Sequence, residues 1–153
     1  MKLTRKEEIV IVAAKLFKEK GYSAVSMRDI AQQMDIKAAS LYNHIKGKQE
    51  ILSSLVLHVA REFTNSTQTI TSQDGTALQR LKKLIEVHID ITLHHADAIA
   101  ALNNDWMHLD GQDLLDFIAM RYQYEENFRS IIKQGIQEQQ IKAKEPEVIL
   151  FSI

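Results

Sequence analysis

The chain has no cysteine and a single proline, Pro146, among its 153 residues. Without cysteine, neither a disulfide framework nor a thiolate metal site can form. No uninterrupted apolar run approaches the roughly 18 residues that a membrane-spanning helix requires, and the N-terminus lacks the apolar core of a signal peptide. The sequence therefore predicts a cytoplasmic protein with no membrane partner.

Catalytic motifs are missing as well. The chain contains no GxSxG, no Walker loop and no dinucleotide-binding glycine pattern. Of its six histidines, His88 and His95 are seven residues apart, but the polar junction at 94–97 argues against one continuous helix through both. HExxH is absent, as is a Glu followed three residues later by His. We expect no catalytic residues, no metal site, no cofactor and no enzyme activity.

Apolar residues, by contrast, make up 45% of the chain and recur at helical spacing throughout. There is no strand-like alternation and no internal repeat, so the sequence predicts an all-α fold. Thr4 with Glu7 forms a capping box, and Gly21 is positioned to stop the helix that follows. The expected helices cover 4–20, 26–34, 38–44, 48–63, 78–88, 99–106 and 114–135, with a polar loop at 64–76 and a further helix starting at 144–146.

Residues 26–51, SMRDIAQQMDIKAASLYNHIKGKQEI, have the pattern of a helix-turn-helix DNA reader. Ser26 with Asp29 is a capping-box-like start, and a break at 35–37 separates the first helix from a short second one. On that second helix, Leu41 and Ile45 are spaced to anchor it to the core. The opposite side carries small residues and hydrogen-bond donors, which suit close approach to DNA.

We therefore expect Lys37, Ala38 and Ser40 nearest the base edges. Tyr42, His44 and Lys48 are expected on phosphates. Ser26 and Arg28, on the preceding helix, should also reach DNA. The charge agrees with this assignment, because residues 1–50 hold 10 Lys/Arg and 6 Asp/Glu, a net +4, whereas residues 51–153 hold 9 and 14, a net −5.

The run at 21–52, GYSAVSMRDIAQQMDIKAASLYNHIKGKQEIL, resembles the TetR family of one-component transcriptional regulators. Asp35 stands where that family usually has Gly, and Ile45 where it usually has Phe. The resemblance implies a three-helix DNA-binding domain, placed here at residues 1–50. It also implies a helical ligand-binding and dimerisation bundle, placed at 51–153 and apparently cut short in its eighth helix.

The second part offers an apolar helical interior in which a small molecule could bind. Its Asn103–Leu109 stretch and scattered residues from Arg121 to Gly135 resemble TetR members that respond to fatty-acid-type or other hydrophobic ligands. Arg121 is a candidate partner for a ligand carboxylate or, alternatively, for a neighbouring acid. The candidate lining residues are Ile85, His88, Leu102, Trp106, Phe117, Arg121 and Tyr124.

These observations favour a repressor that a hydrophobic or amphipathic effector releases from its operator. Its partners would be double-stranded operator DNA, the effector and a second copy of the chain. A homodimer is expected because one short recognition helix covers too few base pairs to be selective, and the operator should then be a near-palindrome. The alternative is a helical bundle that binds a small molecule or a partner protein and carries a vestigial DNA reader.

Overall fold

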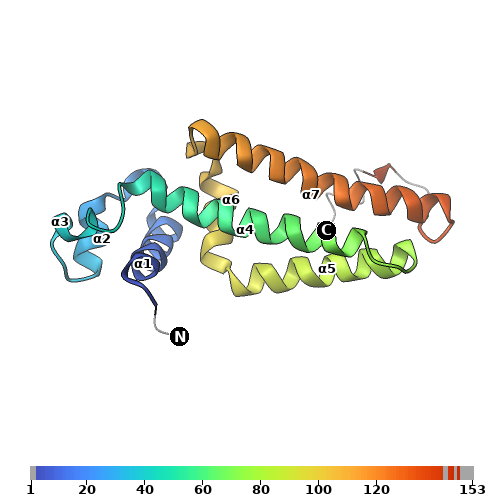
Figure 1. The fold of residues 1–153 in the computed structure, drawn as a ribbon, viewed down its shortest axis with the longest axis horizontal. Coiled ribbons are helices and arrows are strands. Elements are labelled where there is room, and N and C mark those ends of the chain that lie inside the picture. Colours follow the sequence, from blue (N-terminus) through green and yellow to red (C-terminus); the bar gives the residue numbers. More distant parts are fainter. Residues whose placement is uncertain (1–2, 143–144, 147, 149–153) are drawn as a thin grey trace. The chain divides into compact units, whose positions relative to one another are not determined.

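The computed structural model describes residues 3–142, 145, 146 and 148, and every regular element in that part of the chain is a helix (Figure 1). The all-α prediction is therefore confirmed. In this same part, no helix is both long enough and apolar enough to cross a membrane. The helix expected from residue 144 falls largely outside the described residues. The elements are α1 (Arg5–Lys20), η1 (Tyr22–Ala24), α2 (Met27–Gln33), α3 (Ala38–Leu41), α4 (Lys48–Thr71), α5 (Ala77–His94), α6 (Ala96–Asp105), η2 (Trp106–His108) and α7 (Gly111–Gln137).

Both expected capping boxes are present. The Glu7 amide donates to the Thr4 hydroxyl at 3.3 Å, while the Glu7 carboxylate accepts from the Thr4 amide at 2.7 Å. Ser26 and Asp29 make the same reciprocal pair at the start of α2. The Ser26 hydroxyl and amide hydrogen bonds hold the pKa of the Asp29 carboxyl below its usual range. Each pair satisfies amide groups that a helix start would otherwise leave without a partner.

Helix α4 is longer than the sequence predicts, because residues 64–71 continue it instead of forming a loop. Threonine hydroxyls in this segment donate back to carbonyls of the preceding turn: Thr64 to Ala60 at 2.8 Å and Thr69 to Asn65 at 2.9 Å. Such bonds satisfy the hydroxyls inside a helix, so a threonine-rich run need not end it. Ile70 is 6% exposed, which shows that the extension is held by burial as well.

Other helix boundaries also differ from expectation. Helix α3 ends at Leu41 and is followed by a turn, so it is shorter than the predicted 38–44. Helix α5 runs on to His94, and the helix is interrupted at His95 before α6 begins. Helix α7 begins at Gly111 and passes Gly135. A side chain at Gly135 would meet Ile141, so this glycine serves close packing instead of ending the helix.

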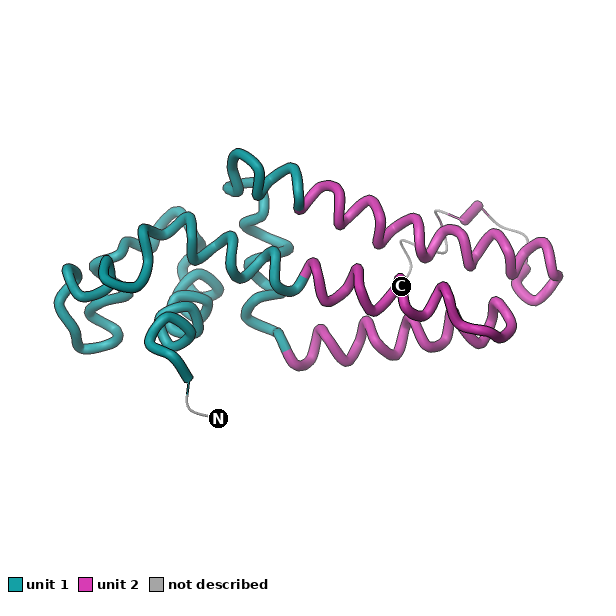
Figure 2. Tube along the Cα trace, in the orientation of Figure 1, with its two compact units in different colours: residues 1–59, 95–116 teal, residues 60–94, 117–153 magenta. Residues whose placement is uncertain are grey.

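The chain divides into two compact units (Figure 2). Unit 1 comprises residues 1–59 and 95–116 and includes α1, α2, α3, α6 and the first half of α4. Its core joins α1 to α2, α3 and α4 through side chains that are at most 2% exposed: Ile9, Phe17, Ile30, Leu41, Ile45, Ile51 and Leu52. An ion pair at 2.9 Å between Lys18 and Asp97 links α1 to α6.

Unit 2 comprises residues 60–94 and 117–153. Within it, the second half of α4 lies beside α5 and α7 (Figure 1). The buried side chains that join these three helices are Ile70, Ala77, Leu81, Leu84, Phe128, Ile131 and Ile132. The boundary between the two units falls inside α4, near residue 60. The domain boundary at residue 50 that the sequence suggests stays a prediction.

Candidate DNA-binding and effector sites

The helix-turn-helix lies entirely within unit 1. Its turn is closed by a hydrogen bond from the Ile36 amide to the Ala31 carbonyl at 3.0 Å. Asp35 reaches this turn through a left-handed backbone conformation, with φ at 53°. The residue that departs from the family's glycine is therefore the one whose backbone conformation glycine favours.

Helix α3 is held on one side by buried apolar residues, and its other side is open to solvent. Leu41 is fully buried and Ile45 is 2% exposed, as their spacing predicts. Tyr42 is 55% exposed, and Lys37 and His44 are also exposed, whereas Ala38 and Ser40 are half-buried. The short helix α3 and the turn after it are thus held by two apolar anchors, with small residues on the helix and exposed donors on the residues that flank it. Which of them touch bases and which touch phosphates stays a prediction.

The two candidates on the preceding helix are exposed as well. Arg28 lies in the first turn of α2 with its side chain open to solvent. Ser26 is also exposed, but its hydroxyl is already occupied by the capping box. Arg28 is therefore the stronger of the two as a phosphate donor.

Lys48 has a structural partner that its position in the sequence does not reveal. Its ammonium donates to the carbonyls of Tyr22 at 2.7 Å and Val25 at 2.8 Å, and it lies 4.2 Å from the centre of the Tyr22 ring. An ammonium has three hydrogens, so one donor remains for a phosphate. Lys48 consequently fixes the start of α4 against the segment before α2, whether or not it also binds DNA.

A second network ties η1 to α4 and η2 inside unit 1. The Tyr22 hydroxyl donates to the Gln49 side-chain oxygen at 2.8 Å, and the Gln49 amide donates to the His108 carbonyl at 2.9 Å. The Tyr22 ring also stacks on His108, with ring centres 5.2 Å apart. Burial, followed by the charges of Asp110 and Asp105, raises the pKa of Tyr22, so its hydroxyl remains a donor. These contacts hold η1 and the start of α4 to η2.

The effector candidates are brought together only in part. In unit 2, His88 of α5 and Tyr124 of α7 are hydrogen-bonded at 2.6 Å between Nδ1 and the hydroxyl oxygen. Phe63 of α4 stacks on His88 at 5.2 Å between ring centres. Burial lowers the pKa of His88 and raises that of Tyr124, so both are neutral at pH 7. The result is an aromatic cluster with a polar centre.

The remaining candidates are distributed over both units. Ile85 packs against the unit 2 core, and Phe117 is 3% exposed. Arg121 is exposed and pairs with Glu125 at 3.1 Å, which is the neighbouring acid that the sequence offered as its alternative partner. Leu102 and Trp106 belong to unit 1. Their joint role with the unit 2 residues in one binding site stays a prediction.

Comparison with known protein families decides the classification. The profile described as "Tetracyclin repressor-like, C-terminal domain" matches residues 74–153, more than half of the chain. A second profile, described as "Bacterial regulatory proteins, tetR family", matches residues 9–55, which contain the helix-turn-helix. The chain belongs to the TetR family. Its members are transcriptional regulators, and the resemblance inferred from the sequence is confirmed.

Individual TetR proteins are similar to this chain over most of its length. The HTH-type transcriptional repressor KstR2 of Mycobacterium tuberculosis is 26% identical over 136 residues, covering 88% of this chain and 68% of that relative. The crystal structure of PfmR from Thermus thermophilus is 26% identical and has a TM-score of 0.81, covering 94% of this chain and 79% of PfmR. AibR in complex with isovaleryl coenzyme A and operator DNA is 23% identical, with a TM-score of 0.82 over 97% of this chain and 81% of AibR. The expected TetR fold is thus confirmed.

Some residues of interest carry no signal in the sequence. Asn127 of α7 and Thr67 of α4 are both buried in unit 2, and the Asn127 amide donates to the Thr67 hydroxyl at 3.0 Å. Phe63 could have been included among the effector candidates, because it follows Val59 on the buried face of α4. Thr67 could not, since the polar run around it indicates a loop. The sequence likewise gives no reason to group His58 and Glu62 with His95, which spacing pairs only with His88.

Proposed function

We propose that this TetR protein is a DNA-binding transcriptional repressor that a small hydrophobic or amphipathic molecule releases from its operator. The observation that supports it best is the exposure of Lys37, Tyr42 and His44, which flank the short helix α3, beside the buried Leu41 and Ile45. A recognition helix needs this arrangement, with apolar anchors on one side and donors on the other. KstR2, named a transcriptional repressor, supports the direction of regulation.

The effector class is supported by the aromatic cluster in unit 2. Phe63, His88 and Tyr124 combine apolar ring faces with a neutral hydrogen-bonded pair, which suits a ligand with a hydrocarbon body and a polar end. AibR, known in complex with isovaleryl coenzyme A and operator DNA, supports an acyl-type effector within this broader class. A fatty acid or acyl thioester is therefore the first ligand to test.

The functional unit we propose is a homodimer on a near-palindromic operator. Two copies of α3 would enter successive major grooves on one side of the duplex, with half-site centres about 34 Å apart or at a multiple of that spacing. Analytical ultracentrifugation with and without operator measures this assembly. A monomer that still binds operator selectively at micromolar concentration would contradict it.

Fluorescence anisotropy against DNA flanking the gene tests the DNA-binding proposal. Tyr42→Phe removes one donor expected on phosphate and should weaken binding to all sequences by a similar factor. Lys37→Ala should change which sequence is preferred. Tyr122→Phe on α7, whose ring is 64% exposed, is the matched control and should change neither property. Failure of the wild-type chain to select any sequence would instead favour a vestigial reader on a partner-binding bundle.

A further inference from the structure

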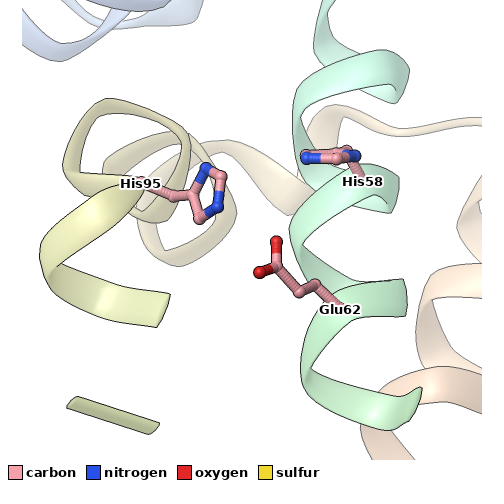
Figure 3. A group of neighbouring side chains, drawn as sticks. All are labelled: His58, Glu62 and His95. Atoms are coloured by element: carbon pink, nitrogen blue, oxygen red, sulfur yellow. The ribbon is translucent and has the colours of Figure 1, made fainter. Parts of the chain in front are cut away.

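Three side chains outside the sites described above converge near the middle of α4 (Figure 3). His58 and Glu62 are four residues apart on this unbroken helix, so they project from the same face one turn apart. His95 lies at the break between α5 and α6, as the residue before α6 begins. Like His58, it belongs to unit 1, and the two imidazole rings have their centres 5.5 Å apart.

These residues offer the ligand atoms that a transition metal uses. One nitrogen from each imidazole and one Glu62 carboxylate oxygen lie within 4.8 Å of one another. Zinc holds such atoms at about 2.0–2.2 Å, so ligands of a tetrahedral ion are separated by about 3.4 Å. Binding would therefore draw the three ligand atoms closer together than they are in this structure. The His58 side chain is exposed and the other two are half-buried, so both an entering ion and a fourth ligand have access.

We propose that His58, Glu62 and His95 bind a divalent first-row transition metal, Zn²⁺ in the first place. Two imidazole nitrogens and one carboxylate are the ligand set of many open zinc sites, in which water or another molecule takes the fourth position. The same set is too nitrogen-rich for Ca²⁺ or Mg²⁺, which prefer oxygen ligands alone. This proposal departs from the sequence-based expectation of no metal site, which considered His95 only with His88.

The position of the site gives a bound ion a route to the DNA reader inside unit 1. An ion held by His58 and His95 ties α4 to the start of α6. The first residue of α4, Lys48, is bonded to the carbonyls of Tyr22 and Val25 just before α2. This consequence depends on the proposed DNA binding. The site itself does not, and it is tested below without DNA, so the two ideas can fail separately.

Isothermal titration calorimetry of the metal-stripped chain with zinc chloride measures the site. The expected result is one Zn²⁺ per chain in the wild type. Affinity should fall at least about 100-fold in His95→Ala and in Glu62→Gln, because loss of a direct ligand costs more than the 10–100-fold typical of residues that support one. With Co²⁺ in place of Zn²⁺, visible absorption should report a four-coordinate ion in the wild type and not in His95→Ala.

His94→Ala is the matched control, since it removes a neighbouring imidazole whose side chain is 69% exposed and hydrogen-bonded to the Asp90 carbonyl. It should leave Zn²⁺ affinity unchanged. Equal affinity in the wild type and His95→Ala, or an equal loss in His94→Ala, would overturn the proposal. Circular dichroism checks folding, and if His95→Ala unfolds, His58→Gln takes its place with the same expected loss. Zn²⁺ should also raise the melting temperature of the wild type and of His94→Ala, but not of the ligand variants.

Discussion

Asp35 holds a backbone conformation that its side chain disfavours. At φ 53° an L-residue is strained by about 1–2 kcal/mol, somewhat less for Asp, whereas Gly adopts it freely. Asp35→Gly relieves this strain but makes the unfolded chain more flexible, so the free energy of unfolding should stay within about 0.5 kcal/mol. Asp35→Val should lower it by about 2 kcal/mol, because a β-branched residue fits this region worst. Urea denaturation measures both.

The matched control places the same glycine in a right-handed helix. Gln33 is the last residue of α2, and Gln33→Gly should lower the free energy of unfolding by about 1 kcal/mol, since no strain is relieved there. If Asp35→Gly costs as much as Gln33→Gly, the turn is not strained as the φ angle indicates.

The buried His88 predicts a loss of stability in mild acid. Burial lowers its pKa in the folded state, whereas in the unfolded chain it takes up a proton near pH 6.5. Between these two pKa values the unfolded state binds more protons, so the free energy of unfolding falls as pH drops below about 6.5. His88→Gln should reduce the difference in that free energy between about pH 7.5 and 5.5. Urea titrations at the two pH values measure it.

The control for this experiment is His94→Gln on the same helix, at a side chain that is 69% exposed. This variant replaces an imidazole but leaves the buried His88 in place, so it should keep the wild-type pH dependence. An identical pH dependence in the wild type and His88→Gln would show that burial of His88 does not shift its protonation.

At the scale of helices, the sequence predicts well the starts that carry a capping box. Thr4 and Ser26 are the N-caps of α1 and α2, and the sequence shows them because a capping box is a local pattern of a few residues. The end of α4 could not be found in the same way. Its last turns are held by burial of Thr67 and Ile70 against other helices, and that burial depends on residues distant in the sequence.

The same distinction applies to the candidate sites. The outer face of α3 follows from spacing alone, since Leu41 and Ile45 fix which side is buried. The bonds of Lys48 to Tyr22 and Val25 do not, because they join residues more than twenty positions apart. Nor can spacing reveal that His58 lies beside His95.

The pairing of α4 with α7 in unit 2 includes a buried polar contact. Asn127 donates to the Thr67 hydroxyl at 3.0 Å, and its oxygen accepts from the Gln123 amide at 2.9 Å. Thr67→Val has nearly the same shape but leaves the Asn127 donor without this acceptor. We expect the free energy of unfolding to fall by about 1–3 kcal/mol, the cost of an unsatisfied buried donor. Thermal and urea denaturation measure the change.

The double variant Thr67→Val with Asn127→Leu separates the contact from packing. Removing both partners should recover much of the loss, since no buried donor is then unsatisfied. The control is Thr69→Val, at an exposed threonine of the same helix, which should change stability by less than about 0.5 kcal/mol. Additive losses in the double variant would contradict the proposed coupling.

For the molecule as a whole, the feature that matters is that α4 contributes residues to both units. Its first turn carries Lys48, bonded beside the DNA reader, and its second half carries Phe63 in the aromatic cluster. Under the proposed function, a ligand bound at that cluster would act on the reader through this shared helix, by favouring one of two positions of it. A ligand that favours the position unsuited to DNA by about 3 kcal/mol would weaken operator binding by about two decades.

This coupling must be reciprocal, and reciprocity is the sharper test. Operator DNA should lower the affinity for a fatty-acid or acyl-thioester probe by the same factor as the probe lowers operator affinity, because the coupling free energy belongs to the pair of sites. Calorimetric titration of the probe with and without saturating operator measures one direction, and anisotropy with and without probe measures the other. Phe63→Ala should weaken the probe while leaving operator affinity in its absence unchanged. A probe that binds equally well with and without operator would show that the cluster, even if occupied, does not control the reader.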